Sequence, residues 1–144
     1  MKESPQNSSR RFPKAERLHS KKLMDALFSK GASFSFYPFA IKFLPNPDGK
    51  ALAHQMLVSV SKRHFKKAVD RNLIKRRVRE AYRLQRGEYL SQMSNNKYLL
   101  IAYIYIAKEI HTFDFIESKL IAAFGRLSSK LNRRKDESSG KGDL

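Results

Sequence analysis

The sequence contains no cysteine and no tryptophan, and its 144 residues include only 13 acids against 30 lysines and arginines. The lack of cysteine excludes a disulfide framework, a thiol nucleophile and a zinc site built from thiolates. The shortage of acids leaves a formal net charge of +17. Such a charge suits a nucleic acid or an anionic membrane surface as the partner, and it says nothing by itself about the fold.

Long hydrophobic runs are missing too. The longest, at residues 98–107, falls well short of the roughly 20 residues that a helix needs to cross a bilayer. Residues 2–16 are polar and lack the apolar centre of a secretory signal. We therefore expect a cytoplasmic protein without a membrane span. A hydrophobic share of 41% is still enough for one core, and the length suits a single domain.

Motifs for catalysis and metal binding are also absent from the sequence. The four histidines are scattered and do not have the spacing of metal ligands. There is no glycine-rich phosphate loop, no nucleophile elbow and no paired-carboxylate motif. We therefore expect no metal site and no catalytic side chain in this chain.

Much of the positive charge lies in residues 58–85. This segment begins like a strand, with Val58 and Val60 alternating with serines, and then becomes helical. Between residues 62 and 79, Asp70 is the only acid. The cations of that block are Lys62, Arg63, Lys66, Lys67, Arg71, Lys75, Arg76, Arg77 and Arg79.

The spacing of these residues separates two sides of a helix. With about 100° per residue, an apolar side for the core is predicted. An arc about 100° wide beside it forms a cationic ridge. Because Glu80 is the only acid between residues 71 and 86, the cations repel one another, and this favours a bound polyanion over a merely solvated face. The core side comprises Ile74, Val78, Ala81 and Gln85; the ridge comprises Lys75, Arg86, Arg79, Asn72, Arg83 and Arg76.

The chain before the basic segment is predicted to form one helix and three strands. Ser20 and Gly31 mark the ends of a helix over residues 21–30. Pro38 separates a short strand at 32–36 from a second at 39–44. A turn at 45–50 leads to a third strand at 51–61, and we expect the second and third strands to pair as an antiparallel hairpin. Their shared face carries small and polar residues, which suits an extended ligand or a solvated surface: Ala40, Lys42, Ser59 and Ser61.

The rest of the chain supplies a strand and a helix. Residues 87–97 are predicted to be a connection, and the apolar run at 98–107 a central strand covered on both faces. Thr112 is the predicted cap of the last helix, whose core side runs to Leu131. Residues 1–9 and 132–144 are predicted to be disordered, which leaves one domain at 10–131. The predicted class is α+β, in the order α-β-β-β-α-β-α.

The basic segment resembles the bacterial ribonuclease P protein subunit. Residues 17–18 and 28–31 fit the family pattern as well. The chain departs from it at Leu73 and Tyr103, where the family usually has arginine, and at Met24, where it often has phenylalanine. The matching residues of the basic segment are Val58, Ser59, Val60, Ser61, Lys62, Ala68, Val69, Arg71, Asn72, Ile74, Lys75, Arg76, Arg79, Glu80 and Ala81.

The resemblance implies a small mixed sheet with a left-handed β-α-β crossover, as in the second domain of ribosomal protein S5. It also implies a subunit of the endoribonuclease that removes the 5′ leader of precursor tRNA. The catalytic RNA carries the chemistry and binds most of the Mg²⁺, and the partners are that RNA and precursor tRNA, with no further protein required. The basic helix binds the catalytic RNA, and a groove between sheet and helix holds the leader.

The resemblance assigns residues to both surfaces. Those expected to bind the RNA subunit are Arg71, Asn72, Lys75, Arg76, Arg79, Arg83, Lys66 and Lys67. Those expected in the leader groove are Phe28, Met24, Lys42, Ser61, Lys62 and Arg63. Three alternatives remain open from the charge pattern alone: a ribosomal or other structural RNA-binding protein, a DNA-binding module, and a protein-only nuclease.

Overall fold

The structure, a computed structural model, describes residues 13–90 and 98–142, with side chains as far as residue 131. It is a single α+β domain, as predicted. The elements are η1 (Lys14–Glu16), α2 (Lys21–Lys30), β1 (Ala32–Phe36), β2 (Phe39–Pro45), β3 (Gln55–Val60), α3 (Ala68–Tyr89), β4 (Leu99–Tyr105) and α4 (Phe113–Gly142).

The four strands form one mixed sheet in the order β1-β2-β4-β3. β1, β2 and β4 are antiparallel neighbours, and β3 lies parallel to β4. The predicted hairpin between β2 and β3 is therefore wrong, because β4 lies between them. β4 is the most apolar strand, and the centre of the sheet is where such a strand can be covered on both faces. The turn at 45–50 reverses the chain without pairing the strands on either side of it.

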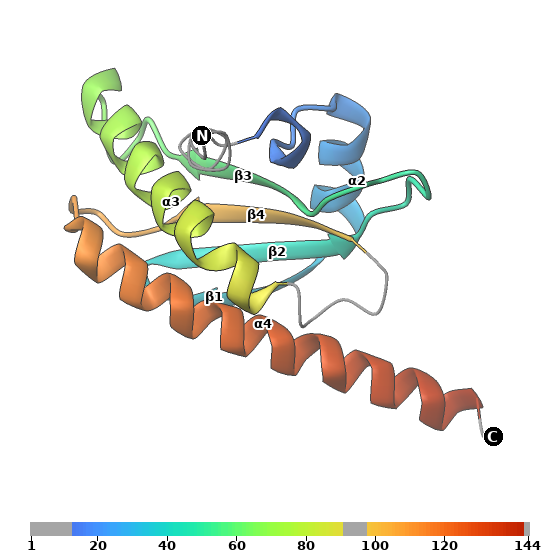
Figure 1. Cartoon of the computed structure of the whole chain (residues 1–144). Helices are drawn as coiled ribbons and strands as arrows, with labels where there is room; N and C mark the ends of the chain where they lie inside the picture. The colour runs from blue at the N-terminus through green and yellow to red at the C-terminus, as the bar shows by residue number, and fades with distance from the viewer. Residues whose placement is uncertain (1–12, 91–97, 143–144) are drawn as a thin grey trace, which may run out of the picture.

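The main core lies on the face of the sheet that α3 and α4 cover (Figure 1). Phe39, Ile41 and Phe43 of β2 point to this face, opposite the small and polar face that the sequence predicts. Met56 and Val58 of β3 join them. α3 connects the parallel strands β3 and β4 across this face in the left-handed crossover that the family resemblance implies (Figure 1).

The opposite face carries α2, which covers only one end of the sheet. There Leu27 packs in a smaller cluster with Leu18, Leu100 and Ala102. Leu44 packs against the same cluster. Ile104, farther along β4, is only partly buried. The prediction of a central strand covered on both faces therefore holds for the first part of β4 and fails for the end that α2 does not reach.

The ends of α2 agree with the prediction, and Ser20 caps the helix by accepting a hydrogen bond from Leu23 N at 3.3 Å. Gly31 does end α2, but with an ordinary φ of −73°. A Cβ at Gly31 would lie 2.4 Å from the Leu27 carbonyl oxygen and 3.0 Å from that of Phe43. Glycine is therefore required because two backbone carbonyls approach closely, and not because of a left-handed conformation.

Most strand ends differ from the predictions by one or two residues, and three boundaries differ by more. β3 begins at Gln55, because the preceding residues belong to the turn region. α3 continues through Gly87 to Tyr89, where a connection was predicted; residues 91–97 of that connection lie outside the described residues. α4 continues to Gly142, although a disordered tail was predicted from residue 132. The lysines, arginines and glutamate of that region are good helix formers, and no proline stops the helix. Among the described residues, no helix is long and apolar enough to cross a membrane.

His54 joins the end of α3 to the start of β4. Its Nδ1 accepts a hydrogen bond from Leu99 N at 2.9 Å, and the ring also bonds to the Leu90 backbone. Burial lowers the pKa of His54 below its usual 6.5, and the bond to Leu90 opposes part of that change. The unfolded chain therefore binds this proton more readily than the folded protein.

We expect the free energy of unfolding to decrease as the pH falls below 6.5, where the unfolded chain gains a proton on His54 that the folded protein resists. Urea unfolding between pH 7.5 and 5 measures the effect. The substitution His54→Gln should make this pH dependence shallower, because it removes the titrating ring. Equal slopes for the wild type and His54→Gln would contradict the assignment.

Candidate nucleic-acid interface

α3 carries its apolar residues toward the sheet and most of its cations away from it. Ile74, Val78 and Ala81 are fully buried, as predicted. Tyr82 completes the buried side in place of Gln85, whose amide donates to Glu117 Oε2 of α4 at 3.0 Å. At 100° per residue, Gln85 falls in the middle of the apolar side and Tyr82 at its edge, so helical spacing alone does not predict that the ring of Tyr82 is buried and the amide of Gln85 bonds to α4.

The cationic ridge divides into exposed and paired members. Asn72, Arg76 and Arg79 are exposed, while Lys75 is partly buried. Arg83 Nη2 lies 2.6 Å from Glu80 Oε2, and this bond lowers the pKa of Glu80. The predicted ridge is therefore present as one side of α3, but Arg83 is already held by an acid of the same helix.

The far end of the ridge is paired as well. Arg86 Nε lies 2.5 Å from Glu16 Oε1 of η1. Although Arg79 is exposed overall, desolvation by the surrounding protein, and then the nearby charge of Arg17, lower the pKa of Arg79. The N-terminal segment thus approaches the ridge with one acid and one further cation. No sequence pattern indicated this approach, because Glu16 and Arg86 are far apart in the chain.

Arg71 has a structural role that was not predicted from the sequence. Its Nη1 donates to the carbonyl oxygens of Phe65 and Lys66, at 2.7 and 2.9 Å, and so closes the loop before α3. Lys66 and Lys67 are exposed in this loop. Arg77, on the other side of α3, donates to the His111 carbonyl oxygen at 2.5 Å and faces away from the ridge.

The small and polar face predicted for the sheet lies at the end that α2 leaves uncovered. The strand registers place Ser35 beside Ala40, Ala40 beside Ile104, and Ile104 beside Ser59. We call these four residues the floor row; each of them is exposed or partly buried. Three of the four have small side chains, so the row leaves the backbone accessible to an extended ligand. Ile104 was missed, although its alternation with Ala102 could have revealed it.

Of the predicted groove residues on α2 and β2, Lys42 lies closest to the floor row in the chain, two residues from Ala40 on the same face of β2. Phe28, near the end of α2, is 42% exposed, so its ring is available at the surface. Lys42 is partly buried, and its Nζ donates to the Phe28 carbonyl oxygen at 3.4 Å. A cation there also interacts favourably with the C-terminal end of the helix dipole. Met24 is partly buried and packs against the cluster beneath α2.

The remaining predicted groove residues lie in the loop after β3. Lys62 and Arg63 are exposed. The Ser61 hydroxyl accepts a hydrogen bond from Arg63 N at 2.9 Å, so it shapes the turn. Phe65 is buried and fixes the loop to the main core. The loop thus carries its cations on a fixed backbone between the floor row and α3.

Tyr103 occupies a position where the family usually has arginine, and its side chain does not reach the surface. Its side chain points into the main core, where it is 1% exposed. Burial raises the pKa of Tyr103 well above its usual range. Its hydroxyl has no hydrogen-bond partner among the described residues. The floor row uses Ile104 instead, which faces the other side of the sheet.

We expect Tyr103→Phe to leave the free energy of unfolding unchanged or to raise it by up to about 1 kcal/mol, because it removes a buried hydroxyl that makes no hydrogen bond. Tyr105→Phe is the matched control. The Tyr105 hydroxyl donates to the Glu109 carbonyl oxygen at 2.8 Å and accepts from His111 N at 3.2 Å. Loss of the Tyr105 hydroxyl should lower the free energy of unfolding, measured with urea, by about 1–2 kcal/mol. If Tyr103→Phe were the more damaging of the two, the hydroxyl of Tyr103 would have a partner after all.

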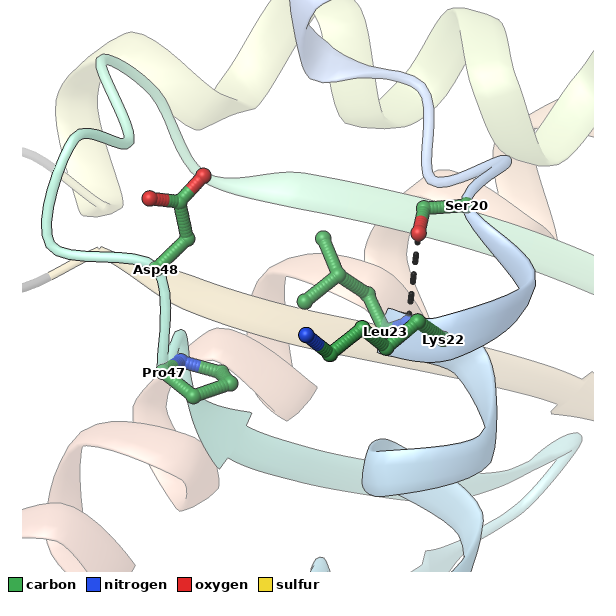
Figure 2. A pocket seen from close by; sticks show the side chains of 5 residues that line it. All are labelled: Ser20, Lys22, Leu23, Pro47 and Asp48. Carbon is green, nitrogen blue, oxygen red and sulfur yellow. Dashed lines mark hydrogen bonds between the residues drawn. The ribbon is translucent and has the colours of Figure 1, made fainter.

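A cavity of about 410 Å³ lies between the start of α2 and the turn after β2. Figure 2 shows Ser20, Lys22 and Leu23 on one side and Pro47 and Asp48 on the other. The cavity is lined by one cation and one acid, and none of the predicted RNA-binding residues lines it. In the described part of the chain, no three histidine, aspartate or glutamate side chains gather in a group that could hold a metal ion.

Comparison with known proteins supports the family resemblance. The family model described as ribonuclease P matches residues 12–128. A ribonuclease P protein component from Porphyromonas gingivalis is 31% identical over 119 residues, which cover 82% of this chain and 87% of that protein. A protein of the same description from Picosynechococcus sp. is 35% identical over 106 residues, covering 74% and 85%.

Solved structures agree with this result. The RNase P protein from Thermotoga maritima superposes with a TM-score of 0.61 at 26% identity, covering 77% of this chain and 96% of that one. The Staphylococcus aureus RNase P protein gives a TM-score of 0.56 at 26% identity, covering 76% and 92%. The predicted fold is thereby confirmed. On the sequence matches and the fold together, the chain belongs to the bacterial ribonuclease P protein family.

Proposed function

We propose that this family member binds the catalytic RNA of ribonuclease P through α3 and holds the 5′ leader of precursor tRNA on the uncovered end of the sheet. The observation that carries the proposal is the continuity of the two surfaces. β3 contributes Ser59 to the floor row, the cationic loop follows directly, and α3 begins where that loop ends. One stretch of chain can therefore contact both the catalytic RNA and its substrate. This role places the protein in the cytoplasm.

The exposed cations explain how the protein would assist an RNA catalyst. Bringing precursor tRNA onto the catalytic RNA sets phosphates against phosphates, and cationic side chains reduce that repulsion and release counterions. Lys66, Lys67, Arg76 and Arg79 are exposed and suited to phosphate contacts. Asn72 adds hydrogen bonds to sugar or phosphate oxygens, and Lys75 contributes charge from a partly buried position. Arg71 and Arg83 contribute less, since their guanidinium groups already bond within the protein.

The leader surface is proposed from shape and from three kinds of contact. Small side chains in the floor row let a single strand approach the sheet closely. The exposed ring of Phe28 offers a face on which a base can stack. Lys42, and beyond the floor row Lys62 and Arg63, supply positive charge for the leader phosphates. Met24 borders this surface, and Ser61 shapes the loop at its end.

In this proposal, the protein's own residues bind and orient RNA, and none of them is a catalytic side chain. Mg²⁺, held mainly by the RNA subunit, supplies the metal chemistry of cleavage. The protein needs no further protein partner for this role. What it contributes is a lower electrostatic cost of assembling catalyst and substrate, an effect that high Mg²⁺ concentrations can partly replace.

The test adds this protein to a bacterial ribonuclease P RNA at low Mg²⁺ and measures leader removal from precursor tRNA. We expect restored cleavage with both components and none with the protein alone. Precursor tRNA should also bind the assembled enzyme more tightly than mature tRNA does. Failure to restore cleavage, or equal binding of the two tRNAs, would contradict the proposal and favour a structural RNA-binding protein. Cleavage by the protein alone would indicate a protein nuclease, and equal competition by duplex DNA a general nucleic-acid binder.

A further inference from the structure

The loop between β3 and α3, residues 61–67, carries four exposed cations and no acid. Like charges so close together repel one another, and this repulsion alone would spread the loop into solvent. The structure nevertheless gives the loop a defined backbone that several hydrogen bonds hold. The loop therefore depends on the rest of the protein for its shape. Its cations are Lys62, Arg63, Lys66 and Lys67.

The first half of the loop is a closed turn. Phe65 N donates to the Ser61 carbonyl oxygen at 3.1 Å, and Arg63 N donates to the Ser61 hydroxyl at 2.9 Å. The ring of Phe65 is buried in the main core and packs against Tyr105, with the ring centroids 6.0 Å apart. These contacts enclose Lys62 and Arg63 between two fixed points, the end of β3 and the anchored Phe65.

The second half of the loop depends on one side chain of α3. Arg71 Nη1 donates to the carbonyl oxygens of Phe65 and Lys66, at 2.7 and 2.9 Å. In the described part of the chain, these two oxygens accept no other hydrogen bond. Bonds from a charged donor are shorter and stronger than bonds between neutral groups. Phe65 is thus held on both sides, its N–H by Ser61 and its carbonyl by Arg71.

The loop lies where the two proposed RNA surfaces meet. Ser59 of the floor row is only three residues before Lys62, and α3 begins directly after the loop. Arg71 belongs to the start of α3, but its guanidinium group bonds to the loop. Any shift of the loop relative to α3 would break these bonds. The helix and the loop therefore move as one unit as long as Arg71 is present.

We propose that Arg71 is a positioning residue for leader binding: its bonds to the loop hold Lys62 and Arg63 at the end of the floor row. Without the guanidinium group, the two carbonyls turn to water, and the repelling cations move apart. The inference rests on the proposed function and gives Arg71 a different role from the contact with the RNA subunit that the resemblance implies. The same side chain then couples the helix that binds the catalytic RNA to the loop that binds its substrate.

The preference of the assembled enzyme for precursor over mature tRNA tests this role. With ribonuclease P RNA saturated by protein, weaker binding between the two subunits does not affect the ratio of the two tRNA affinities. Arg71→Met keeps the apolar stem and removes the donors. It should lower the ratio about fivefold, as expected when phosphate contacts of the loop are lost. An unchanged ratio would overturn the proposal.

Arg77→Met is the matched control. Arg77 lies on the same helix and donates to the His111 carbonyl oxygen at 2.5 Å, on the side away from the loop. Its substitution removes the same charge and a bond of the same kind, and it should leave the tRNA ratio at the wild-type value. Equal losses for the two variants would indicate a general effect of destabilising α3 and would overturn the positioning role.

A mutant cycle shows whether Arg71 acts through the loop. The double variant Lys62→Ala/Arg63→Ala should itself lower the tRNA ratio. Adding Arg71→Met to it should lower the ratio little further, because Arg71 acts by placing the side chains that are already gone. Effects that multiply would mean that Arg71 contributes to leader binding independently of these two cations, and the proposal would fail.

Limited digestion with trypsin measures the loop itself. Cleavage after Lys62 or Arg63, identified by mass spectrometry, should be several times faster in Arg71→Met than in the wild type or Arg77→Met. Equal cleavage rates would overturn the proposal. Arg71→Gln carries the same expectations and replaces Arg71→Met if that variant does not fold. If the wild type shows no preference for precursor tRNA, the proposed function fails; if only Arg71→Met behaves like the wild type, the positioning role alone fails.

Discussion

Replacing Arg76 and Arg79 together by alanine is expected to weaken binding of ribonuclease P RNA about 30-fold at low salt. Each exposed cation that contacts a phosphate contributes on the order of 1 kcal/mol, and about 1.4 kcal/mol corresponds to a tenfold change in affinity. Both residues are exposed on the ridge, and neither is held by an acid in the way that Arg83 is. Filter binding at a series of salt concentrations measures the affinity and its dependence on salt. The slope of log affinity against log salt concentration should fall in magnitude by about two.

The matched control is Lys50→Ala with Lys108→Ala. Both lysines are exposed and lie outside α3, and their removal lowers the net charge by the same amount. If general attraction between a cationic protein and RNA explained binding, both double variants would lose the same affinity. We expect at most a twofold loss for the lysine pair. Thermal unfolding of the Arg76/Arg79 variant should stay close to that of the wild type, and a large drop would assign those arginines to the fold.

Gly31→Ala is expected to destabilise the protein by about 3 kcal/mol, and to lower the melting temperature by roughly 10 °C. The new Cβ would lie 2.4 Å from the Leu27 carbonyl oxygen and 3.0 Å from the Phe43 carbonyl oxygen. Both atoms belong to the backbone of packed elements, so neither moves without shifting α2 or β2. Because Phe28 and Lys42 lie on these two elements, leader binding should also weaken in the folded fraction.

Gly125→Ala is the control, and it is expected to change stability in the opposite direction. Gly125 lies inside α4, and a Cβ there has no neighbour within 4 Å. Alanine should therefore raise stability by up to about 1 kcal/mol, because it favours the helix more than glycine does. Differential scanning calorimetry of the two variants should show a lower melting temperature for Gly31→Ala and a higher one for Gly125→Ala. A neutral result at Gly31 would mean that α2 can shift at little cost.

Much of the fold follows from local patterns, and the part that does not follow depends on which strands meet. The prediction that Ala40 and Ser59 share a face agrees with the structure, in which Phe39 and Val58 lie on the opposite face, in the core. Those patterns could not show that β4 separates β2 from β3, because a turn fixes a reversal of the chain and not the partner of each strand. The stretch after residue 131 has the charged composition of a tail, yet the same residues favour a helix once α4 is under way.

In the site, too, local sequence patterns predict the face on which a residue lies but not its contacts with distant segments. Helical spacing predicted the ridge, and strand alternation predicted that Lys42 and Ser59 share a face, which the registers confirm. Spacing could not predict that Arg71 closes its own loop or that Glu16 reaches Arg86, since these contacts depend on how distant segments pack. The sequence shows how many cations a segment carries, whereas contacts within the folded protein determine which of them can bind a ligand.

The position of β4 in the sheet has a consequence for synthesis on the ribosome. When translation has passed α3, the nascent chain holds the β1–β2 hairpin and β3 as separate pieces, because the strand that joins them has not yet emerged. Until then, β2 and β3 expose backbone edges that can pair with other chains. Arrival of residues 99–105 closes the sheet from its middle in one step, so the protein acquires its protection against aggregation late in translation.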